Sequence, residues 1–490
     1  MGDPAMAAME GMIEKEKAPA PIDYKFMDGL RGIGAFVVYV CHFLDRYYHV
    51  PTKKMYDTKT KSAEHMLPDW MRTTPITVLY HGYFWVVVFF VLSGFVLTLR
   101  FFKIRKATCV TGGTFRRYVR LMIPVWFIVS FYYMAIRFQL LDGADYDDKN
   151  DFSELKDKTY MDFVFDSTIG IWYGDNTWMV AVWTLSIELT ATFMVYLLAQ
   201  TAVEYRGRFY IYGVTCLFFL VPYYLDKWGF TDYKLEKTHT KISVIYHYPI
   251  FIFGVAIADL EMMPNRPLDM FRGWWWPYAT LKNILLLFIG ISFGGHRGSS
   301  CLYENSGPCE FFRIISFDEW LARDLMMYIG GLAWIFLALT SDATQWVLGS
   351  CFFQFFGKIS YSLYLVHALF VFWLQNDLIR NLYERGGMKY DYAVAIAFGA
   401  YTPVLVLVSW LLTIVVDEPY KDFAYELDMA SRYKQPPVRS TAGGGEIASE
   451  KSDGKRASKF LTNSWKFFAL VIYMLMVYVT TEAYSYYAVN

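Results

Sequence analysis

The chain has 490 residues, 55% of them hydrophobic and 20% aromatic, and its 46 basic residues balance its 46 acidic ones. With only 19% of residues charged, this composition excludes an ordinary soluble protein of this length and predicts a membrane protein with many spans. The zero net charge gives no indication of a nucleic-acid partner. Residues 1–22 are polar without an apolar core, so we expect no cleavable signal peptide.

Apolar runs long enough to cross a bilayer of about 30 Å, roughly 20 residues each, recur along the chain. We therefore expect an all-α fold, a polytopic bundle of eleven spans in the lipid bilayer. Lys282 interrupts the seventh span, and residues 344–357 are too short to cross and are expected in the interface. The spans are expected near 29–48, 79–99, 121–140, 178–201, 208–225, 242–260, 276–295, 324–341, 359–377, 393–416 and 464–486.

Loop charges predict the orientation, because basic loops are retained in the cytoplasm. The loop after the third span, 141–177, carries ten acidic and three basic residues, so it is expected outside the cytoplasm. The N-terminus is then cytoplasmic. The loop after the second span is expected inside, because it holds no acidic residue among its cations Arg100, Lys103, Arg105, Lys106, Arg116, Arg117 and Arg120.

Two of the six cysteines, Cys301 and Cys309, share the loop after the seventh span, which this topology places outside. An oxidising outside compartment favours a disulfide between them, and two free thiols are the alternative.

The segment 430–459 is rich in proline, glycine and serine and has no apolar period, which is typical of a disordered linker. No internal repeat is visible, which disfavours a transporter built from two related halves. The expected division is a cytoplasmic segment 1–26, a ten-span body 27–423, a disordered cytoplasmic linker 424–463 and an accessory transmembrane helix 464–490.

Arg31 and His42 share one face of the first span. Eleven residues turn a helix through about 1,100°, three turns and some 20° more, and advance it by about 16 Å. Arg31 is then near the cytoplasmic surface and His42 deep. Glycines at 29, 32 and 34 allow another backbone or a ligand to approach. Ionisable residues inside membranes cost roughly 2.5–3.5 kcal/mol and tend to be functional, although a hydrogen-bonded core histidine is the alternative.

A second ionisable residue, Glu188 in "WTLSIEL", lies mid-span and needs an imidazole or a guanidinium as partner. His247 and His367 are further candidates, with a packed structural histidine as the alternative for each. Imidazole titrates near neutral pH and can remove the proton from an attacking hydroxyl.

The basic residues could bind a polyanionic ligand, because guanidinium groups form bidentate bonds to phosphates. The loop 100–120 would supply several of them, although retention of basic loops in the cytoplasm explains its charge without a ligand. No phosphate-loop motif, zinc signature, G-x-S-x-G elbow or metal-ligand cluster occurs, so we expect no metal.

These segments resemble the acyltransferase-3 family of integral-membrane proteins, whose hallmark is an arginine and a histidine separated by ten residues in the first span. Five further motifs follow in the family's order, and the resemblance covers 27–423. The six matching segments are "MDGLRGIGAFVVYVCHF" (27–43), "FFVLSGFVLT" (89–98), "FRRYVRLMIP" (115–124), "WTLSIEL" (183–189), "GKISYSLYLVH" (357–367) and "VVDEPYKDF" (415–423).

The resemblance implies transfer of an acyl group, usually acetyl, from cytoplasmic acyl-CoA to a hydroxyl of a carbohydrate, lipid or small metabolite. It implies His42 as general base, Glu188 orienting it, and Ser93 or Tyr361 as oxyanion donors, with Ser93 as a helix-packing residue the alternative. His367 matches the family's late histidine. The donor's phosphates are expected on Arg31, Arg116, Arg117 and Arg120. The segment "IELTATF" lacks the second acid or glutamine that often follows the glutamate, which leaves the proton relay open.

Two other classes of protein remain open: a carrier of an organic anion or acyl donor, and a catalytically silent structural subunit.

The extra last helix would pack on the body or on a partner protein. An endomembrane or the plasma membrane is expected as the location.

Overall fold

The computed structural model describes 23–48, 67–68, 70–71, 74–105, 107–138, 158–173, 178–179, 182–227, 247–272, 276–295 and 319–433. Every regular element in these ranges is a helix, which confirms the expected all-α fold. The linker beyond Tyr433, the last span and the Cys301–Cys309 disulfide lie outside the described residues and stay predictions.

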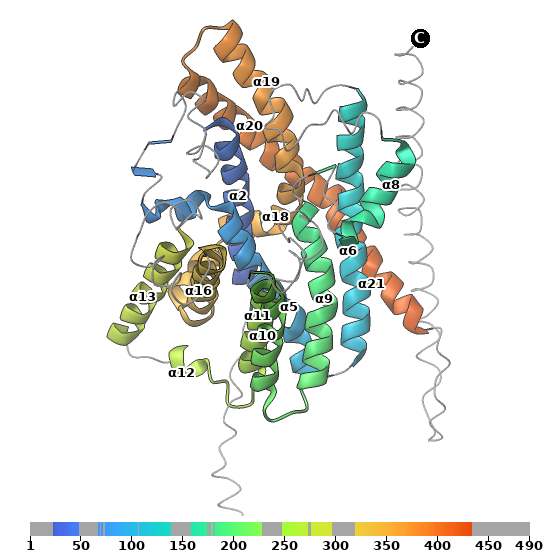
Figure 1. The fold of residues 1–490 in the computed structure, drawn as a ribbon, viewed down its shortest axis with the longest axis vertical. Helices are drawn as coiled ribbons and strands as arrows, with labels where there is room; N and C mark the ends of the chain where they lie inside the picture. The colour runs from blue at the N-terminus through green and yellow to red at the C-terminus, as the bar shows by residue number, and fades with distance from the viewer. Residues whose placement is uncertain are drawn as a thin grey trace, which may run out of the picture.

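In the described ranges, eleven helices of at least 15 residues form the bundle (Figure 1), and shorter helices connect them. The long helices are α2 (Phe26–Tyr47), α5 (Gly82–Ile104), α6 (Ala107–Arg137), α9 (Trp183–Ala202), α10 (Arg208–Lys227), α11 (Tyr248–Met262), α13 (Trp276–Gly294), α16 (Glu319–Thr340), α18 (Cys351–Leu369), α20 (Tyr390–Leu412) and α21 (Glu418–Tyr433). The shorter ones are η2 (Pro75–Tyr80), α8 (Tyr160–Thr168), η4 (Gly170–Tyr173), α12 (Asp269–Arg272), α17 (Asp342–Leu348), η8 (Phe370–Leu374), α19 (Gln375–Arg380), η9 (Asn381–Arg385) and η10 (Thr413–Asp417).

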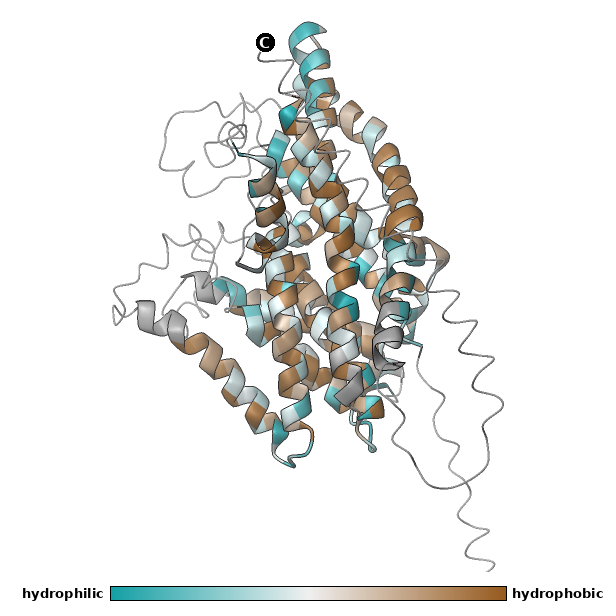
Figure 2. Ribbon diagram, turned by 90° about the vertical axis from the view of Figure 1, so that its right-hand side faces the viewer, coloured by the Kyte–Doolittle hydropathy of each residue, from teal (hydrophilic) through white to brown (hydrophobic). Residues whose placement is uncertain are grey.

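Eight helical stretches of the described residues are long and apolar enough to cross a membrane. Figure 2 shows hydrophobic residues along most of the helices and hydrophilic ones gathered toward the ends of the bundle. The chain is therefore an integral, multi-pass membrane protein. The expected fifth and sixth spans correspond to α10, whose apolar stretch Arg208–Val221 is short, and to α11, which has only 15 residues, so the number of crossings stays a prediction.

α11 carries two buried carboxylates, Asp259 and Glu261, and both are paired. Glu261 is buried; it accepts hydrogen bonds from the Tyr24 hydroxyl at 2.8 Å and from the Arg272 guanidinium at 2.8 Å. Asp259 accepts a hydrogen bond of 3.0 Å from Arg208 on α10. Buried charges are tolerated where they are paired in this way, so the acids hold α10, α11, α12 and the residues just before α2 together.

Helix boundaries differ from the expected ones where polar turns extend a helix. α6 begins at Ala107, well before the expected 121, because its first turns carry the basic residues that a hydropathy window excludes. α18 likewise begins at Cys351, so the expected interfacial segment 344–357 is divided between α17 and α18. α21 runs through the expected domain boundary at 423 and ends at Tyr433.

Glycines permit the closest helix contacts in the bundle. A Cβ on Gly32 of α2 would collide with the backbone of Phe356 and Gly357 on α18. A Cβ on Gly94 of α5 would collide with the Phe251 carbonyl on α11. α2 therefore packs closely against α18, and α5 against α11 (Figure 1), and small residues set that spacing.

Candidate active site

A cavity of about 920 Å³ lies between α2, α5, α6, α9, α18 and α21. It is near one end of the bundle, where α2, α6 and α18 begin and α5 ends, which we call the basic end. Seven basic and three acidic side chains line it, a net charge of +4 that favours an anionic ligand. These charged residues are Arg31, Arg100, Arg116, Arg117, Arg120, Lys358, Lys421, Asp28, Glu188 and Asp417.

Three of the expected site residues meet on one wall of this cavity. Arg117 on α6 donates to Glu188 on α9, with 2.6 Å between Nη2 and Oε2, and to the Ser93 hydroxyl on α5 at 3.5 Å. About a fifth of each charged side chain is accessible, 18% for Arg117 and 22% for Glu188. Of the two partners allowed for Glu188, the structure therefore provides the guanidinium, and Arg117 joins three helices at this wall.

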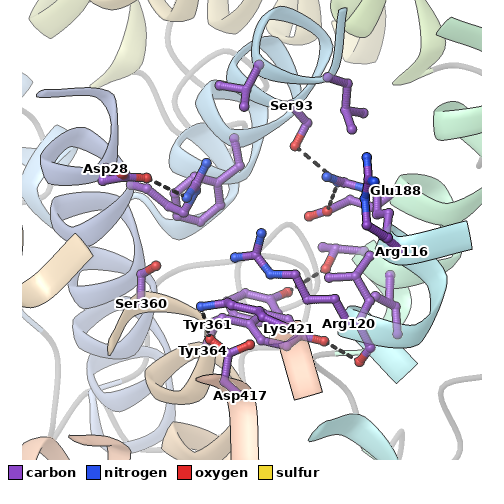
Figure 3. Close-up of a pocket in the computed structure, with 18 of the residues that line it drawn as sticks. Asp28, Ser93, Arg116, Arg120, Glu188, Ser360, Tyr361, Tyr364, Asp417 and Lys421 are labelled. Atoms are coloured by element: carbon purple, nitrogen blue, oxygen red, sulfur yellow. Dashed lines mark hydrogen bonds and ion pairs between the residues drawn. The ribbon is translucent and has the colours of Figure 1, made fainter. Parts of the chain in front are cut away.

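The other arginines reach the cavity from different sides. Arg31 pairs with Asp28 one turn earlier on α2, at 2.8 Å, and Arg116 lies 5.8 Å from the ring of Tyr425. Figure 3 shows Asp28 on the wall opposite Ser93 and Glu188, with Arg120 extending between them. Among the described residues, no hydrogen bond or ion pair holds the exposed Arg120 guanidinium, which leaves all its donors for a bound anion.

Tyr361 also lines the cavity, and its hydroxyl donates to the Leu121 carbonyl on α6 at 2.6 Å. The only proton of the Tyr361 hydroxyl is therefore used in a hydrogen bond to the backbone. The Ser93 hydroxyl accepts from Arg117 and keeps its own proton, so Ser93 is the better placed of the two expected oxyanion donors.

His42 lies beyond the cavity lining, on the α2 face that carries Asp28, Arg31 and Ala35 at helical spacing. Its imidazole stacks on that of His367, with 5.1 Å between ring centroids and 26° between the planes. His367 is fully buried, and its Nδ1 lies 2.7 Å from the carbonyl oxygen of Tyr364, a residue that lines the cavity. His42 is thus connected to the cavity wall through His367 and Tyr364.

Glu188 and His42 make no contact that would let the carboxylate orient the imidazole. The acidic group whose charge acts on His42 is Asp45, three residues further along α2. The structure therefore separates two residues that were expected to work together, because Glu188 is held by Arg117 on the other side of the cavity.

Four cavity residues were not singled out from the sequence, although they stand inside the quoted motifs. Asp28 lies in the first motif, Lys358 in "GKISYSLYLVH", and Asp417 and Lys421 in "VVDEPYKDF". Lys421 pairs with Asp417 at 2.5 Å, and Lys358 pairs with Glu418 at 2.9 Å. Their position inside the motifs was the one sequence feature that pointed to the site. Their charge alone did not distinguish them from ordinary charged residues of the loops.

No group of three or more potential metal ligands occurs among the histidine, cysteine and acidic residues in the described ranges.

The acyltransferase domain that defines the acyltransferase-3 family matches residues 24–414. The chain therefore belongs to this family, as the six sequence motifs indicated, and it is a membrane acyltransferase. Among characterised proteins it is similar to the O-acetyltransferase PaAT-1 of Phomopsis amygdali, with 24% identity over 473 residues, 83% of this chain and 82% of that one. No solved structure gave a significant match.

Proposed function

We propose that the protein is an O-acyltransferase that moves an acyl group, most simply acetyl, from cytoplasmic acyl-CoA to a hydroxyl of a carbohydrate, lipid or small metabolite. The observation that carries the proposal is the cavity with a net charge of +4 whose α2 wall leads to His42. The similarity to an O-acetyltransferase supports the class of acceptor group and the acetyl donor.

The donor's phosphates would bind at the basic end, on Arg31, Arg116 and Arg120. Guanidinium groups suit this role because their planar fork makes paired hydrogen bonds to phosphate oxygens. Arg117 faces the same cavity but is committed to Glu188, so its part is to fix that carboxylate and Ser93. A basic end facing the cytoplasm agrees with the loop charges and puts the N-terminus inside.

The chemistry proposed for His42 is general base catalysis. His42 takes the proton from the acceptor hydroxyl as its oxygen attacks the thioester carbonyl. The new C–O bond forms, the C–S bond breaks, and the proton passes to the leaving thiolate to give free CoA. Ser93, which keeps its own hydroxyl proton, would donate to the carbonyl oxygen as negative charge develops on it.

The body to Tyr433, in which α21 completes the cavity wall, would then carry the whole reaction. The residues after Tyr433 would be a linker, and the helix 464–490 would be an accessory span. Neither a carrier nor a catalytically silent subunit requires a histidine next to a donor-binding cavity. These two alternatives are therefore less well supported.

The test is turnover by the purified full-length protein in lipid nanodiscs. With acetyl-CoA and no added acceptor, slow release of free CoA to water is expected, measured with a thiol reagent. Boiled protein and protein-free nanodiscs are the controls. Tight binding of acetyl-CoA with no CoA release above these controls, with or without added alcohols, would contradict the proposal and favour a carrier.

A further inference from the structure

His42 and His367, which we call the histidine pair, meet because α2 and α18 pack along each other in register. At one end of this contact, a Cβ on Gly32 would collide with the backbone of Gly357. Ten residues further along each helix, the two imidazoles stack. The helices therefore run in the same direction and advance together by about 15 Å between the two contacts. The pair is thus a result of the whole helix–helix contact.

Hydrogen bonds on both sides of the histidine pair hold α2 against the chain that continues α18. Three residues before His42, the Tyr39 hydroxyl accepts a hydrogen bond of 2.8 Å from the Gln375 amide on α19. Five residues after His42, the Tyr47 hydroxyl donates to the Val371 carbonyl in η8 at 2.5 Å. These bonds and the glycine contact fix the distance between the helices without either histidine. A substitution of the histidine on α18 is therefore expected to keep the fold.

The His367 ring is anchored to the backbone of its own helix. Its Nδ1 lies 2.7 Å from the Tyr364 carbonyl oxygen, and because a carbonyl only accepts, Nδ1 must carry the proton. The ring is fully buried, so turning it would break this bond where no water could replace it. His367 therefore offers the His42 imidazole a flat surface whose orientation is fixed.

Packing alone does not explain a histidine at position 367. The second ring nitrogen, Nε2, is buried and has no hydrogen-bond partner among the described residues. A buried acceptor without a partner destabilises a fold, and an aliphatic side chain of similar size would avoid that cost. A buried polar atom of this kind calls for an explanation, and a function of the anchored ring beside His42 provides one.

The residue that anchors His367 is itself fixed to the wall of the donor cavity. The Tyr364 hydroxyl on α18 forms a hydrogen bond of 2.7 Å with the Thr184 hydroxyl on α9, and both residues line the cavity. The orientation of the His367 ring therefore depends on the same wall that a bound donor would contact. Through the stacked rings, this wall can set the orientation of His42 although His42 lies beyond the cavity lining.

We propose that His367 is the positioning residue of the catalytic base. Its anchored ring keeps the His42 imidazole in one plane, so that the base has a constant orientation toward the donor. His367 acts through His42 alone and contacts neither substrate. The proposal rests on the general-base function proposed for His42, and it gives His367 the orienting role that the sequence assigned to Glu188.

The kinetic test uses His367→Asn, which keeps a donor for the Tyr364 carbonyl and removes the ring. In CoA release from acetyl-CoA by the full-length protein in nanodiscs, kcat should fall about 10–100-fold and KM should change less than about twofold, as for a misplacement near 1 Å. Adding His367→Asn to His42→Ala should cause no further loss. His81→Asn is the matched control, because His81 is also buried, with Nδ1 2.6 Å from the Gly294 carbonyl, but lies outside the cavity lining.

A second measurement observes the His42 ring without turnover. The chain has eight histidines, and in protein labelled with ¹³C at histidine Cε1 the resonance of His42 is the one that His42→Ala removes. His367→Asn should shift this resonance because the stacked ring is lost, and His81→Asn should leave it unchanged. If His367→Asn does not fold, His367→Ala carries both tests.

The two measurements separate this inference from the proposed function. A wild-type rate for the folded His367 variant, or a His42 resonance that it does not shift, would overturn the positioning role. Loss of turnover by His42→Ala but not by His367→Asn would contradict this inference alone. Absence of CoA release by the wild-type protein would instead contradict the acyltransferase function.

Discussion

The cavity depends on how single side chains share their hydrogen bonds. Arg117 donates through Nη2 to Glu188 and Ser93, and the Tyr361 hydroxyl donates to a backbone carbonyl. Arg120 makes no hydrogen bond or ion pair among the described residues. Residues that look equivalent in sequence are therefore expected to have different roles: Arg117 to fix the wall, and Arg120 to bind an anion.

The Arg117–Glu188 pair is expected to be strongly coupled. Arg117→Ala leaves the carboxylate in the cavity without its partner, so it should cost more stability than the double variant Arg117→Ala/Glu188→Gln. A coupling of about 0.5–3 kcal/mol is expected from the cycle, in the range for groups in direct contact. Thermal unfolding in detergent measures it. Additive effects of the two substitutions would mean that the pair does not form.

Arg31 is predicted to bind the donor without taking part in bond making. Arg31→Lys keeps the charge but loses the bidentate fork, so the apparent KM for acyl-CoA should rise more than turnover falls. Steady-state kinetics over a range of acyl-CoA concentrations measures the two separately. Lys103→Gln, an exposed cation on α5 outside the cavity lining, is the control. A defect in turnover alone would instead place Arg31 beside the reacting carbonyl.

Much of the site's membership could be predicted from sequence, because charge inside an apolar span is conspicuous. Arg31 and Glu188 were found in this way, Ser93 through the resemblance to the family, and the structure places all three on the cavity. Their partners could not be predicted, since pairing depends on helix rotation and contact. From the sequence, the partner of Glu188 could be a guanidinium or an imidazole, and the fold shows that it is the guanidinium of Arg117. Lys421 was passed over because a cation near a helix end needs no ligand to explain it.

At the scale of helices, glycines decide which pairs can touch. The crossing of α5 and α11 depends on Gly94, whose missing side chain makes room for the Phe251 carbonyl. Hydropathy located nearly every long helix, because apolar runs of bilayer length are unmistakable. It missed the polar turns that begin α6, because a helix that leaves the lipid needs no apolar residues there.

Gly94→Ala is expected to destabilise the fold, because its Cβ would meet a backbone carbonyl that cannot rotate away. Overpacking of this kind costs about 1–3 kcal/mol. Gly213→Ala on α10 is the matched control, since a Cβ there meets nothing within 4 Å. Fluorescence-detected size exclusion after heating compares the two. Equal melting temperatures for both variants would contradict the close α5–α11 crossing.

In the molecule as a whole, the cavity lies within the part of the chain that ends with α21. Lys421 and Tyr425 on α21 line it, so the body needs this helix to close the cavity wall. A cavity near one end of the bundle gives the molecule a direction, with the donor expected on the basic side.

A chain that ends after Tyr433, where α21 ends, should therefore still insert and transfer acyl groups. The residues that follow are expected to be a linker too flexible to hold a catalytic group in place. Product formation per folded molecule, compared with the full chain, measures this. A truncated protein that folds and binds acyl-CoA but makes no product would assign the last helix to the site. A chain ending before Glu418 is the control and should lose donor binding, since it lacks that part of the wall.

The central claim is that the basic cavity delivers a donor to His42. The most direct measurement is acyl transfer by His42→Ala, with insertion and acyl-CoA binding checked in the same preparation. His42 is outside the cavity lining, so donor binding should stay within a few-fold of wild type. Transfer should fall by about 10²–10⁴-fold, the usual contribution of a general base. Transfer at the wild-type rate by a variant that inserts and binds donor normally would contradict the account.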